Sequence, residues 1–304
     1  MFKYGDNGKS IFFAILAASM YAISSPISKL LLGHVQPTMM ASLLYLGAGI
    51  GLSAVWFIER LLHKETSEGN LTMKELPFII AMVVLDISAP IFLMVGLSRT
   101  TAANASLLNN FEIVTTSIIA MLIFKEMISK RLWLAISLMT VASIILVAGE
   151  KNSFSFSWGS ILVICACICW GFENNCTRKL SAKNPMQIVI IKGFGSGIGA
   201  FAIALMLKEN SVNIVYIFET LVLGFIAYGL SIYFYVYAQR GLGAAKTSMF
   251  YAVSPFIGVI ISLILFRETP TKLFIIALVI MIIGTYFAST EGEKAEAGGN
   301  NDFD

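Results

Sequence analysis

Three acidic side chains and one lysine lie inside long hydrophobic stretches of this sequence. Glu173 belongs to the stretch CACICWGFENNCTRKL, which begins as an apolar helix and ends on basic residues. Asp86, Glu112 and Lys192 are likewise flanked by apolar residues. A charged side chain near the centre of a membrane helix costs about 2.5–3.5 kcal/mol on insertion scales. These four residues are therefore candidates for binding a substrate, an ion or a proton.

Glu173 and Lys192 lie at a similar depth in their hydrophobic stretches. Each is about six residues from the same side of the membrane, which corresponds to ~9 Å at ~1.5 Å per residue. An ion pair between them would relieve both charges, and the handling of a substrate or a proton is the alternative. If Lys192 neutralises Glu173, then Asp86 and Glu112 have no cation within the membrane. They must then take up a proton, bind a cation or meet a cationic substrate.

Polar side chains gather on one face of the helix predicted around Glu112. One arc of about 160° contains Ser106, Asn109, Asn110, Glu112, Thr116 and Ser117. Such an arc faces the bundle interior or water, because lipid cannot satisfy polar groups. Hydrogen bonds between helices, worth about 0.6 kcal/mol each, are the alternative explanation. Two asparagines beside an acid favour a binding site that includes Asn109, Asn110 and Glu112.

Amide and aromatic residues extend this candidate site. Asn174 directly follows Glu173 and adds an amide to the same helix. Tyr228 and Tyr251 lie deep in their hydrophobic stretches, where their rings could flank an ammonium group. The repeat described below places Tyr228 at the position of Asp86, so we expect both side chains to face the same interior space.

Prolines interrupt three of the hydrophobic stretches. Pro26, Pro90 and Pro255 have no backbone N–H, so each leaves the carbonyl group four residues earlier without its helical partner. Kinked helices with released carbonyl groups often line the binding sites of transporters. Simple kinks satisfied by neighbouring helices or water are the alternative.

The composition indicates that lipid surrounds most of the chain. Of its 304 residues, 57% are hydrophobic and 13% are charged, whereas soluble domains contain about 25% charged residues. A membrane helix needs ~20 mostly apolar residues. Ten stretches fit, at residues 10–32, 38–58, 77–97, 102–124, 132–149, 157–177, 186–207, 217–238, 245–266 and 271–289. We predict an all-α polytopic membrane protein.

The distribution of charge in the loops predicts the orientation. Lysine and arginine are in excess in the loops on the side of both termini, which by the positive-inside rule places both termini in the cytoplasm. The formal net charge of +3 is too small to indicate nucleic-acid binding. The expected partners are a small-molecule substrate and the lipid bilayer, and homodimerisation remains open.

The two halves of the chain repeat one another. The matching segments are Tyr21 to Lys29 with Trp170 to Arg178, LGAGIG at 46–51 with FGSGIG at 194–199, AANAS at 102–106 with AAKTS at 244–248, and FKE at 124–126 with FRE at 266–268. Each half has five predicted spans, an odd number, so the halves cross the membrane in opposite directions. We predict repeats over residues 1–150 and 151–290 and a disordered tail over 291–304.

These repeated segments, together with Pro255, resemble the drug/metabolite transporter superfamily in its ten-helix EamA branch. The resemblance covers residues 10–289. It implies two inverted five-helix repeats around a central cavity, and the export of amino acids or other small metabolites. The chain departs from the family pattern at Ile113, which occupies the position that matches Pro255. The resemblance therefore does not fix the substrate.

Secondary active transport is the function that these features favour. We expect alternating-access export of a small polar metabolite, such as an amino acid or amine, across the inner or plasma membrane, with protons as a candidate driving ion. A flippase for a lipid-linked or amphipathic substrate is the alternative. The sequence has no GxxxxGK[ST] or HExxH motif, and His34 and His63 lie in predicted loops, so we expect no ATP site, metal, cofactor or enzymatic activity.

Overall fold

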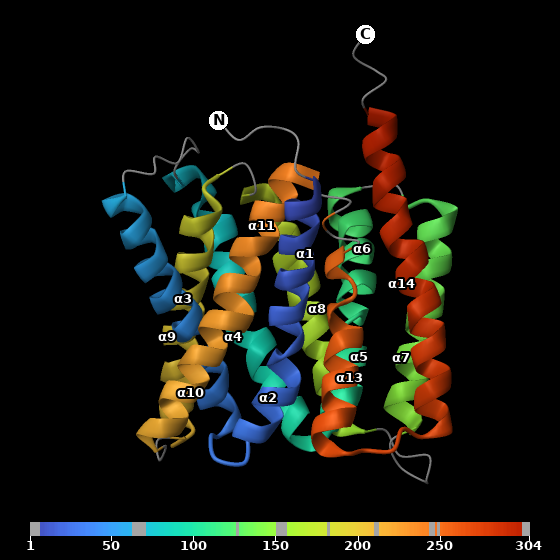
Figure 1. Cartoon of the computed structure of the whole chain (residues 1–304), viewed down its shortest axis with the longest axis horizontal. Coiled ribbons are helices and arrows are strands. Elements are labelled where there is room, and N and C mark those ends of the chain that lie inside the picture. The colour runs from blue at the N-terminus through green and yellow to red at the C-terminus, as the bar shows by residue number, and fades with distance from the viewer. Residues whose placement is uncertain are drawn as a thin grey trace.

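The computed structural model describes residues 7–62, 71–125, 128–149, 157–180, 183–209, 213–242, 247 and 250–299. These residues form helices joined by short loops (Figure 1). The first half contains α1 (Asn7–Ala22), α2 (Ser24–Leu31), α3 (Pro37–Leu61), the 3₁₀-helix η1 (Met73–Glu75), α4 (Leu76–Arg99), α5 (Ala102–Leu108), α6 (Phe111–Phe124) and α7 (Lys130–Gly149). The second half contains α8 (Trp158–Leu180), α9 (Pro185–Met206), α10 (Ile214–Gly224), the π-helix η2 (Phe225–Leu230), α11 (Ser231–Leu242), α13 (Ser254–Phe266) and α14 (Lys272–Gly299).

The helices confirm the predicted all-α membrane architecture. Within the described ranges, nine helical segments are long and apolar enough to cross a membrane, and Ser254–Phe266 is a shorter apolar helix. This shorter helix occupies the second part of the ninth predicted span. Residues 245, 246, 248 and 249, in the first part of that span, lie outside the described residues.

The packing of the helices has the symmetry of an inverted repeat. α3 packs on α9 and α7 packs on α14, and in each of these pairs a helix meets its own counterpart from the other half. α1 packs on α11, and α4 packs on α8 in the corresponding way. Exchanging the two halves therefore reproduces each of these four contacts. The first helix begins and the last helix ends on the same side of the bundle, at the top of Figure 1.

The repeated FKE and FRE segments end equivalent helices with the same backbone conformation. Lys125 follows α6 with φ 54° and Arg267 follows α13 with φ 52°, both in the left-handed region. Residues other than glycine adopt this region uncommonly, and it stops a right-handed helix. The sequence repeat thus corresponds to a repeated helix end.

Two of the three predicted spans that contain an internal proline have breaks in their helices. Ile23 separates α1 from α2, three residues before Pro26, and Pro255 lies in the first turn of α13. By contrast, Pro90 lies inside the continuous helix α4. These positions confirm two of the three predicted interruptions as breaks.

The fourth span is also broken, which corrects the prediction of one helix over residues 102–124. Asn109 and Asn110 form a turn between α5 and α6. The amide of Glu112 donates to the carbonyl of Asn109 at 3.1 Å, three residues back rather than four. In the repeat, this break corresponds to the break before α13. The position that matches Pro255 is Ile113, so the first half has no proline there. Tertiary packing has preserved the break without its sequence signal.

The C-terminal segment differs from the disorder expected after residue 290. α14 continues through Gly299, and residues 300–304 lie outside the described part of the chain. The segment EGEKAEA at 291–297 is rich in glutamate, lysine and alanine, which are strong helix formers. Its composition therefore favours extension of a helix that already exists.

Glycines bring α3 and α9 into backbone contact. A Cβ atom added to Gly193 would lie 2.5 Å from the backbone nitrogen and Cα of Gly49. The backbone cannot yield as the end of a side chain can. The glycines of these two helices therefore serve close helix packing.

Replacing Gly193 by leucine is expected to prevent this contact and to destabilise the protein by at least the ~1–3 kcal/mol typical of overpacking. Ile198→Leu is the matched control, because Ile198 is on the same helix and 59% exposed. Thermal unfolding in detergent, followed by size-exclusion chromatography, measures the difference. Equal melting temperatures for the two variants would contradict the backbone contact.

Candidate functional site

Lys192 on α9 forms ion pairs with two buried acids. Its Nζ atom lies 2.9 Å from Oε1 of Glu173 on α8 and 3.2 Å from Oδ2 of Asp86 on α4. Both acids are almost completely buried. The predicted pair between Glu173 and Lys192 is therefore present. The prediction that Asp86 lacks a cation is wrong, because α4 packs against both α8 and α9 and brings Asp86 to the same ammonium group.

Tyr45 connects this ion cluster to the aromatic residues of the second half. Its hydroxyl donates to Oδ1 of Asp86 at 3.1 Å, and its ring centroid lies 5.4 Å from that of Tyr228. The Tyr228 hydroxyl accepts from Ser24 on α2 at 3.1 Å. Asp86 and Tyr228 thus border one interior region, as the repeat predicts. Tyr45 was not predicted from the sequence, because it stands between two leucines in an apolar segment of α3.

Glu112 forms a second polar cluster, between α6 and α8. Its Oε1 atom accepts from Nδ2 of Asn174 at 2.6 Å, and the same nitrogen lies 3.2 Å from Oγ1 of Thr116. Asn175 donates to the carbonyl of Thr116 at 3.1 Å. Gly171 makes this approach of the helices close, because a Cβ atom there would clash with Thr115. Glu112 and Asn174 are only partly buried.

Tyrosine rings surround the region beside Glu112. The centroid of the Tyr21 ring lies 5.9 Å from the centroids of both Tyr228 and Tyr251. The carboxylate of Glu112 is close enough to interact electrostatically with all three tyrosines. Tyr251 also makes a hydroxyl contact of 3.2 Å with Ser231. The structure therefore brings the predicted Tyr228 and Tyr251 together, and adds Tyr21.

The two asparagines of the fourth span have different surroundings. Asn110 donates to the carbonyl of Leu107 at 3.2 Å and accepts from Thr285 on α14 at 3.4 Å. These bonds satisfy the helix break rather than reach an acid. The Oδ1 atom of Asn109 is buried without a hydrogen-bond partner. The break between α5 and α6 explains why the predicted continuous arc does not form.

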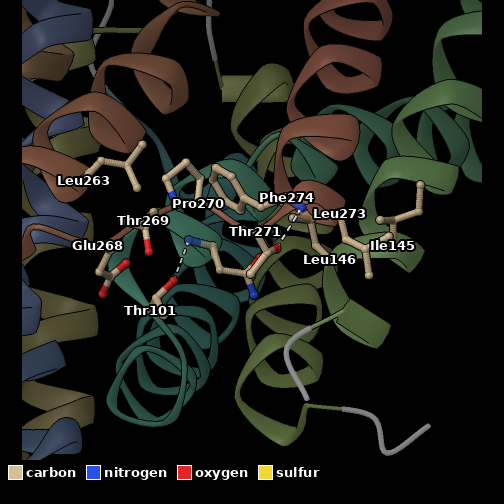
Figure 2. Close-up of a pocket in the computed structure, with 12 residues that line it drawn as sticks. Thr101, Ile145, Leu146, Leu263, Glu268, Thr269, Pro270, Thr271, Leu273 and Phe274 are labelled. Atoms are coloured by element: carbon tan, nitrogen blue, oxygen red, sulfur yellow. Dashed lines mark hydrogen bonds between the residues drawn. The ribbon is translucent and has the colours of Figure 1, made fainter. Parts of the chain in front are cut away.

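A pocket of about 180 Å³ lies away from these two clusters. It opens between the ends of α5, α7, α13 and α14, on the side of the bundle opposite the termini (Figures 1 and 2). Figure 2 shows Glu268 and Thr101 at one end of the pocket and Ile145 and Leu273 at the other. The predicted site residues do not line it.

An apolar groove of about 350 Å³ lies among α6, α7 and α8. Its polar lining groups, Thr140 and Ser143, donate to backbone carbonyls of their own helix at 2.7 and 2.9 Å. None of the predicted site residues lines this groove either.

Both halves of the chain match one family of membrane proteins. The EamA-like transporter family matches residues 8–148 and again residues 157–290. The chain belongs to the EamA-like transporter family. The resemblance stated from the sequence is thereby confirmed, and this EamA-like transporter is a multi-pass membrane protein.

Curated relatives of this EamA-like transporter are also named as transporters. It is 24% identical to an uncharacterized transporter of Methanothermobacter thermautotrophicus, over 92% of this chain and 85% of the relative. It is 22% identical to the uncharacterized transporter YyaM of Bacillus subtilis, over 92% of this chain and 93% of the relative. A solved structure described only as a crystal structure of a protein shares the fold. That match has a TM-score of 0.67 and 13% identity, and covers 96% of this chain and 98% of that one.

Replacing Lys192 by methionine is expected to destabilise this EamA-like transporter strongly, because Asp86 and Glu173 are then left as unpaired buried charges. Breaking a buried ion pair in this way costs about 3–5 kcal/mol. Adding Glu173→Gln to Lys192→Met should recover part of the loss, since one unpaired carboxylate is removed. Melting temperatures in detergent measure both effects.

Lys208→Met is the matched control, because Lys208 is exposed at the end of the same helix. If Lys192→Met lowers the melting temperature no more than Lys208→Met does, the ion cluster does not contribute to stability.

Proposed function

We propose that this EamA-like transporter is a secondary active transporter that exports a small polar metabolite, an amino acid or an amine, by alternating access. The observation that supports this most is the contact between Glu112 and Asn174. It joins the two repeats through a carboxylate that is only partly buried inside an apolar bundle. A polar group in that environment is expected to meet water or a polar substrate.

The interface between the repeats also contains the ion cluster. Asp86 belongs to the first half, and Glu173 and Lys192 belong to the second. Movement of one half against the other, the motion expected of inverted repeats, therefore changes the surroundings of every buried charge in both clusters. We place the chain in the inner or plasma membrane with both termini in the cytoplasm, on the basis of the lysine and arginine excess in the loops on that side.

The Glu112→Gln variant is expected to abolish exchange, because it removes the charge of the partly buried carboxylate but keeps its size. The assay is counterflow of a labelled pool of amino acids and amines in proteoliposomes. Glu219→Gln is the control, since Glu219 is an exposed acid within another membrane span. Wild-type exchange that persists in Glu112→Gln would contradict the assigned role, and no wild-type exchange of any pool member would contradict the proposed substrate range.

Proton coupling is part of the same proposal and rests on Asp86. The groups that face its carboxylate are Lys192 on α9, Glu173 on α8 and Tyr45 on α3. Two acids share one ammonium group there, so one negative charge is left uncompensated. A proton taken up by one of the acids can neutralise that charge.

An acidic medium outside substrate-loaded, neutral proteoliposomes is expected to accelerate substrate efflux, because protons that enter drive an antiporter. Asp86→Asn should reduce this dependence on the gradient. Efflux that is indifferent to the pH gradient in the wild type would rule out coupling to protons.

A further inference from the structure

The charges buried between the two halves do not balance. Asp86, Glu112 and Glu173 are acids, and Lys192 is the base that forms ion pairs with Asp86 and Glu173. Among the described residues, no other lysine, arginine or histidine forms an ion pair with any of these three acids. With all four groups ionised, the region has two negative charges in excess.

Lys192 is already engaged by two carboxylates, at 2.9 and 3.2 Å. Together with Asp86 and Glu173 it forms a cluster whose net charge is negative when all three are ionised. A substrate carboxylate that approached this cluster would meet repulsion instead of an available cation. While Asp86 and Glu173 are both ionised, this cluster therefore offers a poor site for the carboxylate group of an amino acid.

Glu112, unlike Lys192, forms no ion pair with an oppositely charged side chain among the described residues. Its hydrogen-bond donor is the neutral amide of Asn174, and its side chain is only partly buried. A carboxylate can accept about four hydrogen bonds, so acceptor capacity remains. A cation that entered the region would find a negative charge that forms no ion pair with a lysine, arginine or histidine among the described residues.

The rings beside Glu112 suit the same kind of ligand. Tyr21 and Tyr251 are partly exposed, and their ring centroids lie 5.9 Å apart. Both lie within electrostatic range of the Glu112 carboxylate. Aromatic faces attract ammonium groups, most strongly where water is excluded. An acid within electrostatic range of two tyrosine rings can therefore attract an organic ammonium ion.

We propose that Glu112, Tyr21 and Tyr251 bind the ammonium group of an organic amine that has no carboxylate, and that such amines are the substrate class. This inference rests on the proposed transport function and narrows it from amino acids and amines to amines. Asn174 holds the Glu112 carboxylate in position through its 2.6 Å hydrogen bond. Each such amine has a related amino acid that carries one additional carboxylate. The ion cluster around Lys192 disfavours binding of that amino acid, because it repels the additional carboxylate.

The test compares amino acids with the amines that decarboxylation makes from them. Tyrosine with tyramine, arginine with agmatine, and lysine with cadaverine each keep the side chain constant and change only the carboxylate. Counterflow in proteoliposomes measures exchange, and the melting temperature of the purified protein measures binding independently of transport. The amine of at least one pair is expected to exchange and to raise the melting temperature, and the amino acid of that pair to do neither.

The aromatic contribution is tested with Tyr21 variants. Tyr21→Leu should raise the half-saturating concentration of the active amine by roughly 5- to 30-fold, because it removes the aromatic face. Tyr21→Phe, which keeps the ring face, should change this concentration little. Tyr286→Leu is the matched control, because the Tyr286 side chain is 61% exposed on α14. Equal losses in Tyr21→Leu and Tyr21→Phe would overturn the role of the ring.

Two outcomes separate this inference from the transport function. Amino acids that exchange as well as their amines would overturn the amine class and leave transport established. If no amine exchanges or raises the melting temperature, the ammonium site is overturned. Counterflow of the wider pool, with Glu112→Gln, then decides separately whether the transport function stands.

Discussion

The central constraint on this protein is that charges placed in an apolar interior must compensate one another there. Removing an ion from water into such an interior costs several kcal/mol, and attraction to a partner repays this only when the geometry is close. Lys192 meets that condition with Glu173 at 2.9 Å and Asp86 at 3.2 Å. Three helices, α4, α8 and α9, are thereby held in one arrangement.

The inverted repeat shows why a lysine is needed at this point. Tyr21 matches Trp170 and Tyr228 matches Asp86, so Ser24 on α2 is the counterpart of Glu173. Ser24 of the first half donates to the Tyr228 hydroxyl of the second half at 3.1 Å, which is a neutral contact. At the equivalent contact between the halves, the same two positions hold the acids Glu173 and Asp86, which would repel each other without a cation. The counterpart of Lys192 is Leu44, which is fully buried in the hydrophobic core.

The sequence predicted the parts of this arrangement that depend on local pattern or on depth. Hydropathy located the spans, the matching segments indicated inverted halves, and equal depth paired Glu173 with Lys192. The approach of Asp86 to the same lysine could not be predicted, because it depends on how α4 packs between α8 and α9. The turn at Asn109 and Asn110 was also missed, since Ile113 gives no local signal where the other half has Pro255.

The connection between the two polar clusters follows from the geometry of α8. Glu173 and Asn174 are adjacent, so their side chains point about 100° apart around the helix axis. One reaches Lys192 on α9 and the other reaches Glu112 on α6. Gly171 keeps α8 against Thr115 on α6, so α8 cannot be displaced from α6 without disturbing that packing. Because a helix rotates as a rigid unit, any rotation of α8 shifts Glu173 and Asn174 together. The ion cluster and the partly buried acid therefore cannot change independently, even though no hydrogen bond or ion pair links them directly among the described residues.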